Sequence, residues 1–211
     1  MSHILIFGDS IAQGYWDEEG GWIARLRKFI DERSIHSKNY DCLIFNLGVS
    51  GDTTEDLLQR FEFETEQRSK ENGKTIFIFA IGGNDSQFYN DKKSLHVAPE
   101  KFSANIQKLI KLARRFSQKI IFIGPTPVDE PLVDPIPWAK EKSYKNIYIK
   151  KYNEIIKNVS KKEKSSFIEL FENWIKIDYK KLLEDGAHPN SEGHEKIFET
   201  VKDFLIKNEL I

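Results

Sequence analysis

Five short runs of mostly apolar residues recur along the chain and alternate with longer amphipathic stretches. The runs are Ile4–Phe7, Leu43–Leu47, Ile76–Ile81, Ile120–Ile123 and Phe167–Leu170. Continuous apolar runs of this length are typical of strands that are buried on both faces of a parallel sheet. Between them, apolar residues recur with helical spacing, as in Trp22, Leu26, Phe29 and Ile30. The alternation predicts an α/β protein, a three-layer α/β/α sandwich with a central parallel sheet of about five strands and right-handed crossovers.

The length of the chain suits one domain. It has 211 residues and contains no internal repeat, low-complexity tract or linker that would divide it. A domain of this size buries roughly 70% of the surface that its unfolded chain exposes, so it needs no disulfide to hold it together. We therefore expect a single domain over residues 1–211.

Charge and composition narrow the partners and the compartment. A net charge of −1 gives no electrostatic reason to expect nucleic acid or an anionic membrane as the partner. The lone cysteine, Cys42, excludes an intramolecular disulfide and fits a reducing compartment. The segment Met1–Phe7 lacks the basic region and the longer apolar run of a signal peptide, and no apolar run approaches the ~18 residues of a membrane span. These features predict a cytoplasmic protein without a membrane span and leave its oligomeric state open.

Two motifs at opposite ends of the chain carry the parts of a hydrolytic triad. Gly8-Asp9-Ser10 follows the first predicted strand, and Asp185-Gly-Ala-His188 precedes the last helical stretch. A serine hydroxyl is a weak nucleophile unless a base takes its proton and a carboxylate orients that base. The spacing of three residues brings Asp185 and His188 to one side of a single turn, so the pattern predicts Ser10 as nucleophile, His188 as base and Asp185 as its partner. An Asp-x-x-His string by itself arises often by chance and then usually caps a helix or lies in a solvated loop.

Glycine-rich polar turns follow the second and third predicted strands. Gly51 lies in the first of these turns and Asn84 in the second. An oxyanion requires donors that converge on one point, commonly backbone N–H groups and a side-chain amide. The amides of Ser10 and Gly51 and the side chain of Asn84 would supply three such donors. The alternatives are an ordinary turn glycine and an Asx turn or helix cap.

Four segments occur along the chain in this order: Phe7-Gly-Asp-Ser-Ile11, Gly51 with its flanking Asn46, Gly48 and Asp52, Gly82-Gly-Asn-Asp85, and Asp185-x-x-His188-Pro189. Together they resemble the four ordered blocks of the SGNH hydrolases, also called the GDSL family. The resemblance covers nearly the whole chain. It implies a flavodoxin-like sheet, a triad of Ser10, Asp185 and His188, and an oxyanion hole made by Ser10, Gly51 and Asn84. The α/β-hydrolase fold is disfavoured because its nucleophile lies in Gly-x-Ser-x-Gly, whereas Ser10 lies in Gly-Asp-Ser-Ile-Ala.

Other chemistry fits the sequence less well. His188 and His194 are six residues apart, which matches no zinc spacing, and the glycines after the strands complete no nucleotide-binding motif. We therefore expect no metal and no cofactor. His194 is expected on the last helix near its beginning, at most as a helper.

The aperiodic segment 124–138 holds five of the seven prolines of the chain. Long irregular loops are commonly functional, and proline stiffens them, so we expect this segment with Trp138 to form a wall of the substrate pocket. The alternative is a stiff surface connection. Trp16 and Phe88 also follow strands that carry motifs and are further candidates for the pocket.

The predicted function is that of a serine esterase which hydrolyses esters of small or soluble substrates, with short acyl or O-acetyl groups, through an acyl-enzyme on Ser10. The same triad would serve an acyltransferase, a lysophospholipase or a thioesterase, and a protein that binds acylated ligands without turnover is the alternative from another class. The expected partner is a small-molecule ester.

Overall fold

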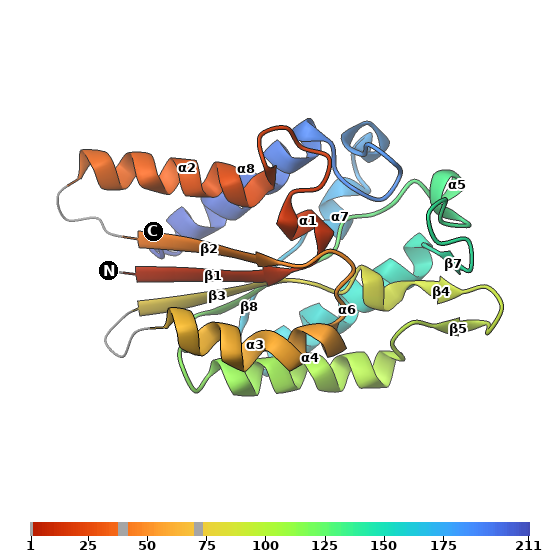
Figure 1. The fold of residues 1–211 in the computed structure, drawn as a ribbon, viewed down its shortest axis with the longest axis horizontal. Coiled ribbons are helices and arrows are strands. Elements are labelled where there is room, and N and C mark those ends of the chain that lie inside the picture. The colour runs from red at the N-terminus through yellow and green to blue at the C-terminus, as the bar shows by residue number, and fades with distance from the viewer. Residues whose placement is uncertain (1, 38–41, 70–73) are drawn as a thin grey trace.

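The computed structural model describes residues 2–37, 42–69 and 74–211. A parallel sheet of five strands forms its centre (Figure 1), made of β1 (Ser2–Gly8), β2 (Cys42–Gly48), β3 (Lys74–Ala80), β6 (Ile120–Ile123) and β8 (Ser166–Ile168). The strand order is β2-β1-β3-β6-β8, and every neighbouring pair is parallel. The predicted fold class, a three-layer sandwich around about five parallel strands, is confirmed.

Helices cover both faces of the sheet because its strands are apolar on both sides. In β1, Ile4 and Ile6 join the hydrophobic cluster beneath α2 (Gly21–His36) and α8 (Ser191–Lys207). Leu5 and Phe7 join the opposite cluster, beneath α3 (Thr54–Arg68), α4 (Pro99–Ala113) and α6 (Asn146–Lys162). Figure 1 shows α2 and α8 on one side of the sheet and α3 and α4 on the other. The period of two in a strand thus divides one apolar run between two cores.

A second, smaller sheet was not predicted from the sequence. It is antiparallel, with the order β5-β4-β7, and consists of β4 (Phe88–Tyr89), β5 (Ser94–Leu95) and β7 (Lys142–Ser143). Each strand has two residues, which is too short to give a periodic signal. The segment 124–138 is not wholly irregular either, because it contains the helical turn α5 (Glu130–Val133). Val128, Val133 and Ile136 from this segment pack into a third hydrophobic cluster.

The carboxyl ends of β1, β2 and β3 lie side by side and carry the predicted motifs. Gly8, Gly48 and Ala80 are in register at these ends. The helical turn α1 (Ser10–Gln13) closes tightly over them, since a Cβ on Gly48 would lie 2.6 Å from the backbone nitrogen of Gln13. Connections from β1 and from β2 lead to helices on opposite faces, which makes this edge a topological switch point, where ligands bind in open α/β sheets.

Short helical turns complete the description: η1 (Asn84–Ser86), α7 (Phe171–Trp174) and η2 (Tyr179–Leu182). Within the described ranges, none of the helices combines the length and the apolarity needed to cross a membrane.

Candidate active site

Ser10 is the first residue of α1, directly after β1. The side chain of Asp9 accepts a hydrogen bond from the amide of Ile11 at 3.0 Å and so caps the turn. Ser10 itself is 7% exposed. As the first residue of a helical turn, it has a backbone N–H without an intrahelical acceptor, and that N–H is available to a ligand.

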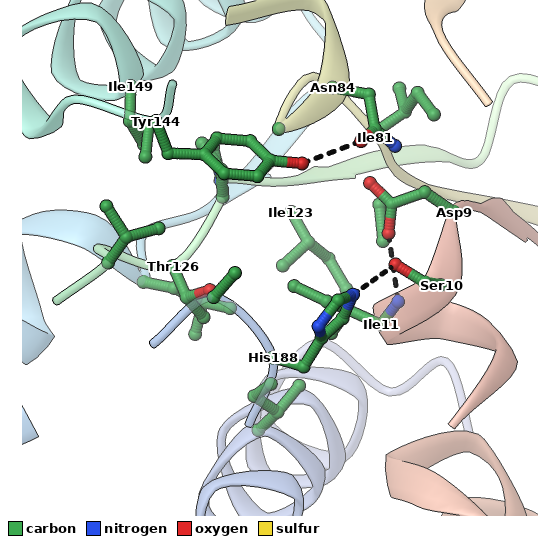
Figure 2. Close-up of a pocket in the computed structure, with 18 of the residues that line it drawn as sticks. Asp9, Ser10, Ile11, Ile81, Asn84, Ile123, Thr126, Tyr144, Ile149 and His188 are labelled. Atoms are coloured by element: carbon green, nitrogen blue, oxygen red, sulfur yellow. Dashed lines mark hydrogen bonds between the residues drawn. The ribbon is translucent and has the colours of Figure 1, made fainter. Parts of the chain in front are cut away.

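The structure brings Asp185, His188 and Ser10 together in one chain of hydrogen bonds. His188 Nδ1 lies 2.7 Å from Asp185 Oδ2, and Nε2 lies 2.9 Å from Ser10 Oγ, a bond that Figure 2 shows as a dashed line. An ionised carboxylate only accepts, so Nδ1 carries the proton and Nε2 is left as the acceptor for the serine hydroxyl. This is the geometry that nucleophile activation requires.

A tight turn holds the carboxylate and the imidazole in place. Asp185 Oδ1 accepts hydrogen bonds from the amides of Ala187 at 2.9 Å and His188 at 2.8 Å. Gly186 adopts a φ of +90°, and a Cβ there would lie 2.7 Å from the Cβ of Leu132. Both the left-handed backbone and the close approach require glycine at this position.

Burial raises the pKa of Asp185, but the hydrogen bonds from the ring of His188 and from the two backbone amides outweigh it and hold the pKa well below the ordinary value. Trp16 adds another donor, because its Nε1 lies 2.8 Å from Asp185 Oδ2. The sequence suggested Trp16 as a pocket residue. Its side chain is instead 56% exposed and acts on the carboxylate from the outer side.

Asn84 is held by a closed ring of hydrogen bonds. Its Oδ1 accepts from the hydroxyl of Tyr144 at 2.7 Å and from Gln87 Nε2 at 3.2 Å, and Gln87 Nε2 also donates to the Tyr144 oxygen at 2.7 Å. Asn84 Nδ2 donates to the carbonyl of Asp52 at 3.0 Å. Reversing the amide would place its nitrogen against the Gln87 donor and its oxygen against a carbonyl, so the ring fixes which end faces the site. Sequence reasoning missed Tyr144 and Gln87, since no motif includes them.

Gly51 lies in the exposed turn after β2, with a φ of +85°. The turn is tied to its neighbours, since Val49 N donates to the carbonyl of Gly8 at 3.0 Å and the carbonyl of Asp52 accepts from Asn84. Among the hydrogen bonds of the described residues, none uses the amide of Gly51 as donor. The structure therefore brings the turn that holds Gly51 next to Asn84 and leaves this N–H available.

Two buried carboxyl groups flank the site. Burial raises the pKa of Asp9 to about 6, although the amide of Ile11 and the charge of His188 oppose the shift. Burial also raises the pKa of Asp85 to about 7 against the hydrogen bonds from Thr54. Asp85 Oδ1 accepts from the amide of Thr54 at 3.0 Å, so it ties the loop after β3 to the first residue of α3.

Aromatic rings flank His188 on its outer side. The ring centroids of Tyr15 and Trp138 each lie 5.7 Å from that of His188. Trp138 is 54% exposed, so it lies against His188 from the solvent side and does not line the pocket beside Ser10. Phe88 stacks on Tyr148 with a centroid distance of 5.4 Å and does not line the pocket beside Ser10.

His194 is buried beneath this rim. Its Nε2 lies 2.9 Å from the carbonyl of Tyr15, and its Nδ1 lies 3.3 Å from the amide of Trp22. The carbonyl can only accept and the amide can only donate, so the ring is the neutral Nε2–H tautomer. His194 therefore holds the backbone of Tyr15 against α2 and α8.

A chamber opens beside Ser10 and His188 and extends inward (Figure 2). Its apolar wall consists of Ile81, Ile123, Val128, Ile149, Leu170 and Ile197. Tyr144, Thr126 and Asn84 also line it. Across the described part of the chain, no group of three or more His, Cys, Asp or Glu side chains is placed to hold a metal ion.

Comparison with known proteins agrees with this arrangement. Residues 4–201 match the family described as GDSL-like Lipase/Acylhydrolase. The chain is 25% identical over 210 residues to the isoamyl acetate-hydrolyzing esterase 1 homolog of Bos taurus and 26% identical to that of Rattus norvegicus, in each case covering 92% of this chain and 78% of the relative.

Solved structures share the fold. A lipase/acylhydrolase from Enterococcus faecalis superposes with a TM-score of 0.75 at 24% identity, covering 97% of this chain and 95% of that one. The acetyl xylan esterase AlAXEase gives a TM-score of 0.73 at 19% identity, covering 96% of this chain and 99% of the other. With a family match over residues 4–201 and four ordered motifs at one edge of the sheet, the chain belongs to the GDSL-like lipase/acylhydrolase family and is a carboxylic ester hydrolase.

Proposed function

We propose that this protein hydrolyses carboxylic esters through an acyl-enzyme on Ser10. The observation that carries the proposal is the unbroken chain from Asp185 Oδ2 through both ring nitrogens of His188 to Ser10 Oγ, with distances of 2.7 and 2.9 Å. The carboxylate of Asp185 only accepts, so the proton of the His188 ring is on Nδ1, and Nε2 accepts the hydrogen bond from the serine hydroxyl. The serine therefore has a base in hydrogen-bond reach, and the base has a partner that stabilises its protonated form.

In the proposed acylation, Ser10 Oγ attacks the ester carbonyl while its proton passes to His188 Nε2. The carbonyl oxygen becomes an oxyanion that faces the amides of Ser10 and Gly51 and the side chain of Asn84. When the intermediate collapses, the C–O bond to the alcohol breaks and His188 returns the proton to the leaving alkoxide. Water then attacks the acyl-enzyme, with His188 as base, and releases the acid and free Ser10.

The substrates that fit the proposal best are esters with short acyl groups on small or soluble alcohols. The limited chamber beside Ser10 supports this choice. The names of the relatives, an isoamyl acetate-hydrolyzing esterase 1 homolog and acetyl xylan esterases, point in the same direction.

The first test is hydrolysis of p-nitrophenyl acetate and butanoate by the wild-type protein and by Ser10→Ala. We expect turnover by the wild type and a loss on the order of 10⁴-fold or more in the variant. The matched control is Ser50→Ala, which removes an exposed serine hydroxyl from the turn after β2 and should change the rate less than twofold. Undiminished turnover in purified Ser10→Ala would rule out this nucleophile.

Product analysis with an added alcohol separates hydrolysis from transfer. We expect the free acid as the main product. If the ester of the added alcohol predominates at low acceptor concentration, the acyl-enzyme assignment stands but the reaction is acyl transfer.

A further inference from the structure

The chamber lies where the three hydrophobic clusters of the fold meet. Ile123, Leu170 and Ile197 belong to the cluster under α2 and α8, Ile81 to the cluster under α3 and α4, and Val128 and Ile149 to the third. Each of these six side chains is at most 3% exposed. Protein cores are packed with few voids larger than a water molecule, so open space at such a junction is a candidate binding site for a ligand.

The size and lining of the chamber describe that occupant. The centres of water-sized molecules can occupy about 60 Å³ in it. One water needs roughly 10–15 Å³ of such space, so the chamber holds about four or five waters, or about as many methylene groups, which are similar in volume. The lining is mostly aliphatic with one buried aromatic ring, that of Trp22, and its polar side chains are few, among them Ser10, Asn84 and Tyr144. A short aliphatic chain fits this space, and a polar or long one does not.

The two sides of Ser10 differ in their access to solvent. On one side lies the buried chamber. On the other lies the outer rim at His188, where Tyr15 is 38% and Trp138 54% exposed. During the reaction the alcohol has to leave and water has to enter beside the base, whereas the acyl group stays bonded to the serine throughout. The enclosed side therefore suits the acyl chain and the open side suits the alcohol.

We propose that the chamber is the acyl site and that it selects aliphatic acyl groups of about four carbons, while the alcohol lies on the open rim and is weakly selected. This inference rests on the proposed function. It assigns contact with the acyl chain to six residues that belong to none of the sequence motifs, namely Ile81, Ile123, Val128, Ile149, Leu170 and Ile197.

The first experiment varies the acyl chain of p-nitrophenyl esters from acetyl to decanoyl with the alcohol held constant. We expect kcat/KM to rise about a hundredfold from acetyl to butanoyl, because two methylenes are added and each buried methylene in a fitting pocket adds about tenfold. It should fall at least tenfold by octanoyl. A parallel series of ethyl, butyl and octyl acetates should change less than about threefold. A rise that continues through decanoyl, or a stronger dependence on the alcohol than on the acyl chain, would overturn the assignment.

The second experiment changes the chamber itself. Ile149 and Ile156 are both buried in α6, at 1% and 0% exposure, but only Ile149 lines the chamber. Ile149→Ala should move the best acyl length upward and raise the hexanoyl-to-butanoyl ratio about tenfold. The matched variant Ile156→Ala creates a void elsewhere in the core and should leave that ratio unchanged. Equal profiles for the two variants would contradict the chamber as acyl site.

A filling variant keeps the test decisive if Ile149→Ala folds poorly. Val128→Phe places a ring in the chamber from the loop after β6 and should lower the butanoyl-to-acetyl ratio about tenfold while acetyl hydrolysis persists. Ser10-dependent hydrolysis with an unshifted acyl profile overturns the chamber assignment alone. The absence of Ser10-dependent hydrolysis with every ester overturns the proposed function as well.

Discussion

The hydroxyl of Tyr144 donates a hydrogen bond of 2.7 Å to Oδ1 of Asn84, and together with the bond from Gln87 it holds the Asn84 amide in a fixed orientation. Figure 2 shows the phenol pointing toward the asparagine. Burial raises the pKa of Tyr144, so the hydroxyl keeps its proton and remains a donor. Tyr144 is therefore a positioning residue for the proposed oxyanion hole, acting through Asn84.

Tyr144→Phe should lower kcat about three- to tenfold and change KM little, which corresponds to the net free energy of about one hydrogen bond. Asn84→Ala removes the donor itself and should cost about 10²–10³-fold. The decisive measurement is the double variant, in which the tyrosine substitution should cost less than twofold because the amide that it orients is gone. Tyr152→Phe is the control, since it also removes a buried phenol hydroxyl, bonded to the carbonyl of Val97 instead. Additive losses in the double variant would show that Tyr144 acts independently of Asn84.

Asp185→Asn should lower kcat by about 10⁴-fold, because an amide at this position favours the imidazole tautomer that cannot accept the serine proton. Since the pKa of Asp185 is well below its ordinary value, the carboxylate stays charged between pH 5 and 8 and contributes no change of rate there. Trp16→Phe removes only one of its donors and should cost a few-fold. A loss of less than tenfold in Asp185→Asn would mean that another group orients His188.

His194 should make folding stability depend on pH in the acid range. Burial lowers the pKa of His194 below 6.5 in the folded state, although the carbonyl of Tyr15 opposes the shift. The unfolded chain therefore binds the proton more readily than the folded protein does. The contribution of His194 to the free energy of unfolding is complete above pH 6.5. It is lost as the pH falls toward the folded pKa, by up to about 1.4 kcal/mol per pH unit.

His194→Ala leaves the amide of Trp22 and the carbonyl of Tyr15 without this partner and should lower the free energy of unfolding by about 2–4 kcal/mol above pH 7. Urea unfolding of both proteins at several pH values gives the difference. Asp9 and Asp85 have raised pKa values, so they change the free energy of unfolding with pH in the direction opposite to His194. Both proteins contain these two residues, so the difference between the proteins removes their contribution. The difference should shrink below pH 6.5, and a constant difference from pH 5 to 8 would contradict the prediction.

Gly48→Ala and Gly51→Ala should lower the free energy of unfolding by different amounts, although Gly48 ends β2 and Gly51 lies in the turn that follows it. A Cβ on Gly48 would lie 2.6 Å from Gln13 N and 2.9 Å from Asp9 O, so α1 must move, at a cost of about 3 kcal/mol or more. A Cβ on Gly51 meets no atom within 4 Å, so only the left-handed backbone is penalised, by about 1–2 kcal/mol. Since α1 carries Ser10, Gly48→Ala should also lower kcat far more than Gly51→Ala. Thermal unfolding and ester hydrolysis of the two variants provide the comparison.

The sequence was sufficient to predict the layers and the sheet. All five strands of the central parallel sheet fall on predicted apolar runs, and Ile120–Ile123 is reproduced residue for residue. The last run was placed over Phe167–Leu170, but β8 spans Ser166–Ile168, because Leu170 precedes the turn of α7 and its apolar side chain continues the pattern without continuing the strand. Apolar character indicates burial and does not separate the end of a strand from the turn that follows.

The chamber could not be predicted in this way. Ser10, Asn84, Asp185 and His188 stand in short motifs that follow predicted strands or precede the last helix. Ile149 and Ile197 follow the same helical pattern as any core residue, and only the tertiary packing distinguishes a side chain that fills the core from one that borders open space. Trp16 is another case, since no sequence pattern indicates its left-handed backbone, with a φ of +64°, its exposure or its bond to Asp185.

The contact between Ser10 and His188 joins residues 178 positions apart. Most of the helices and the pairing of β1 with β2 depend on much shorter separations along the chain, and closing a long loop costs more entropy than closing a short one. Turnover can therefore return during refolding only after the turn before α8 has docked onto the turn after β1. Helix content measured by circular dichroism should recover earlier. The delay between the two signals therefore measures how long the two ends of the chain take to assemble.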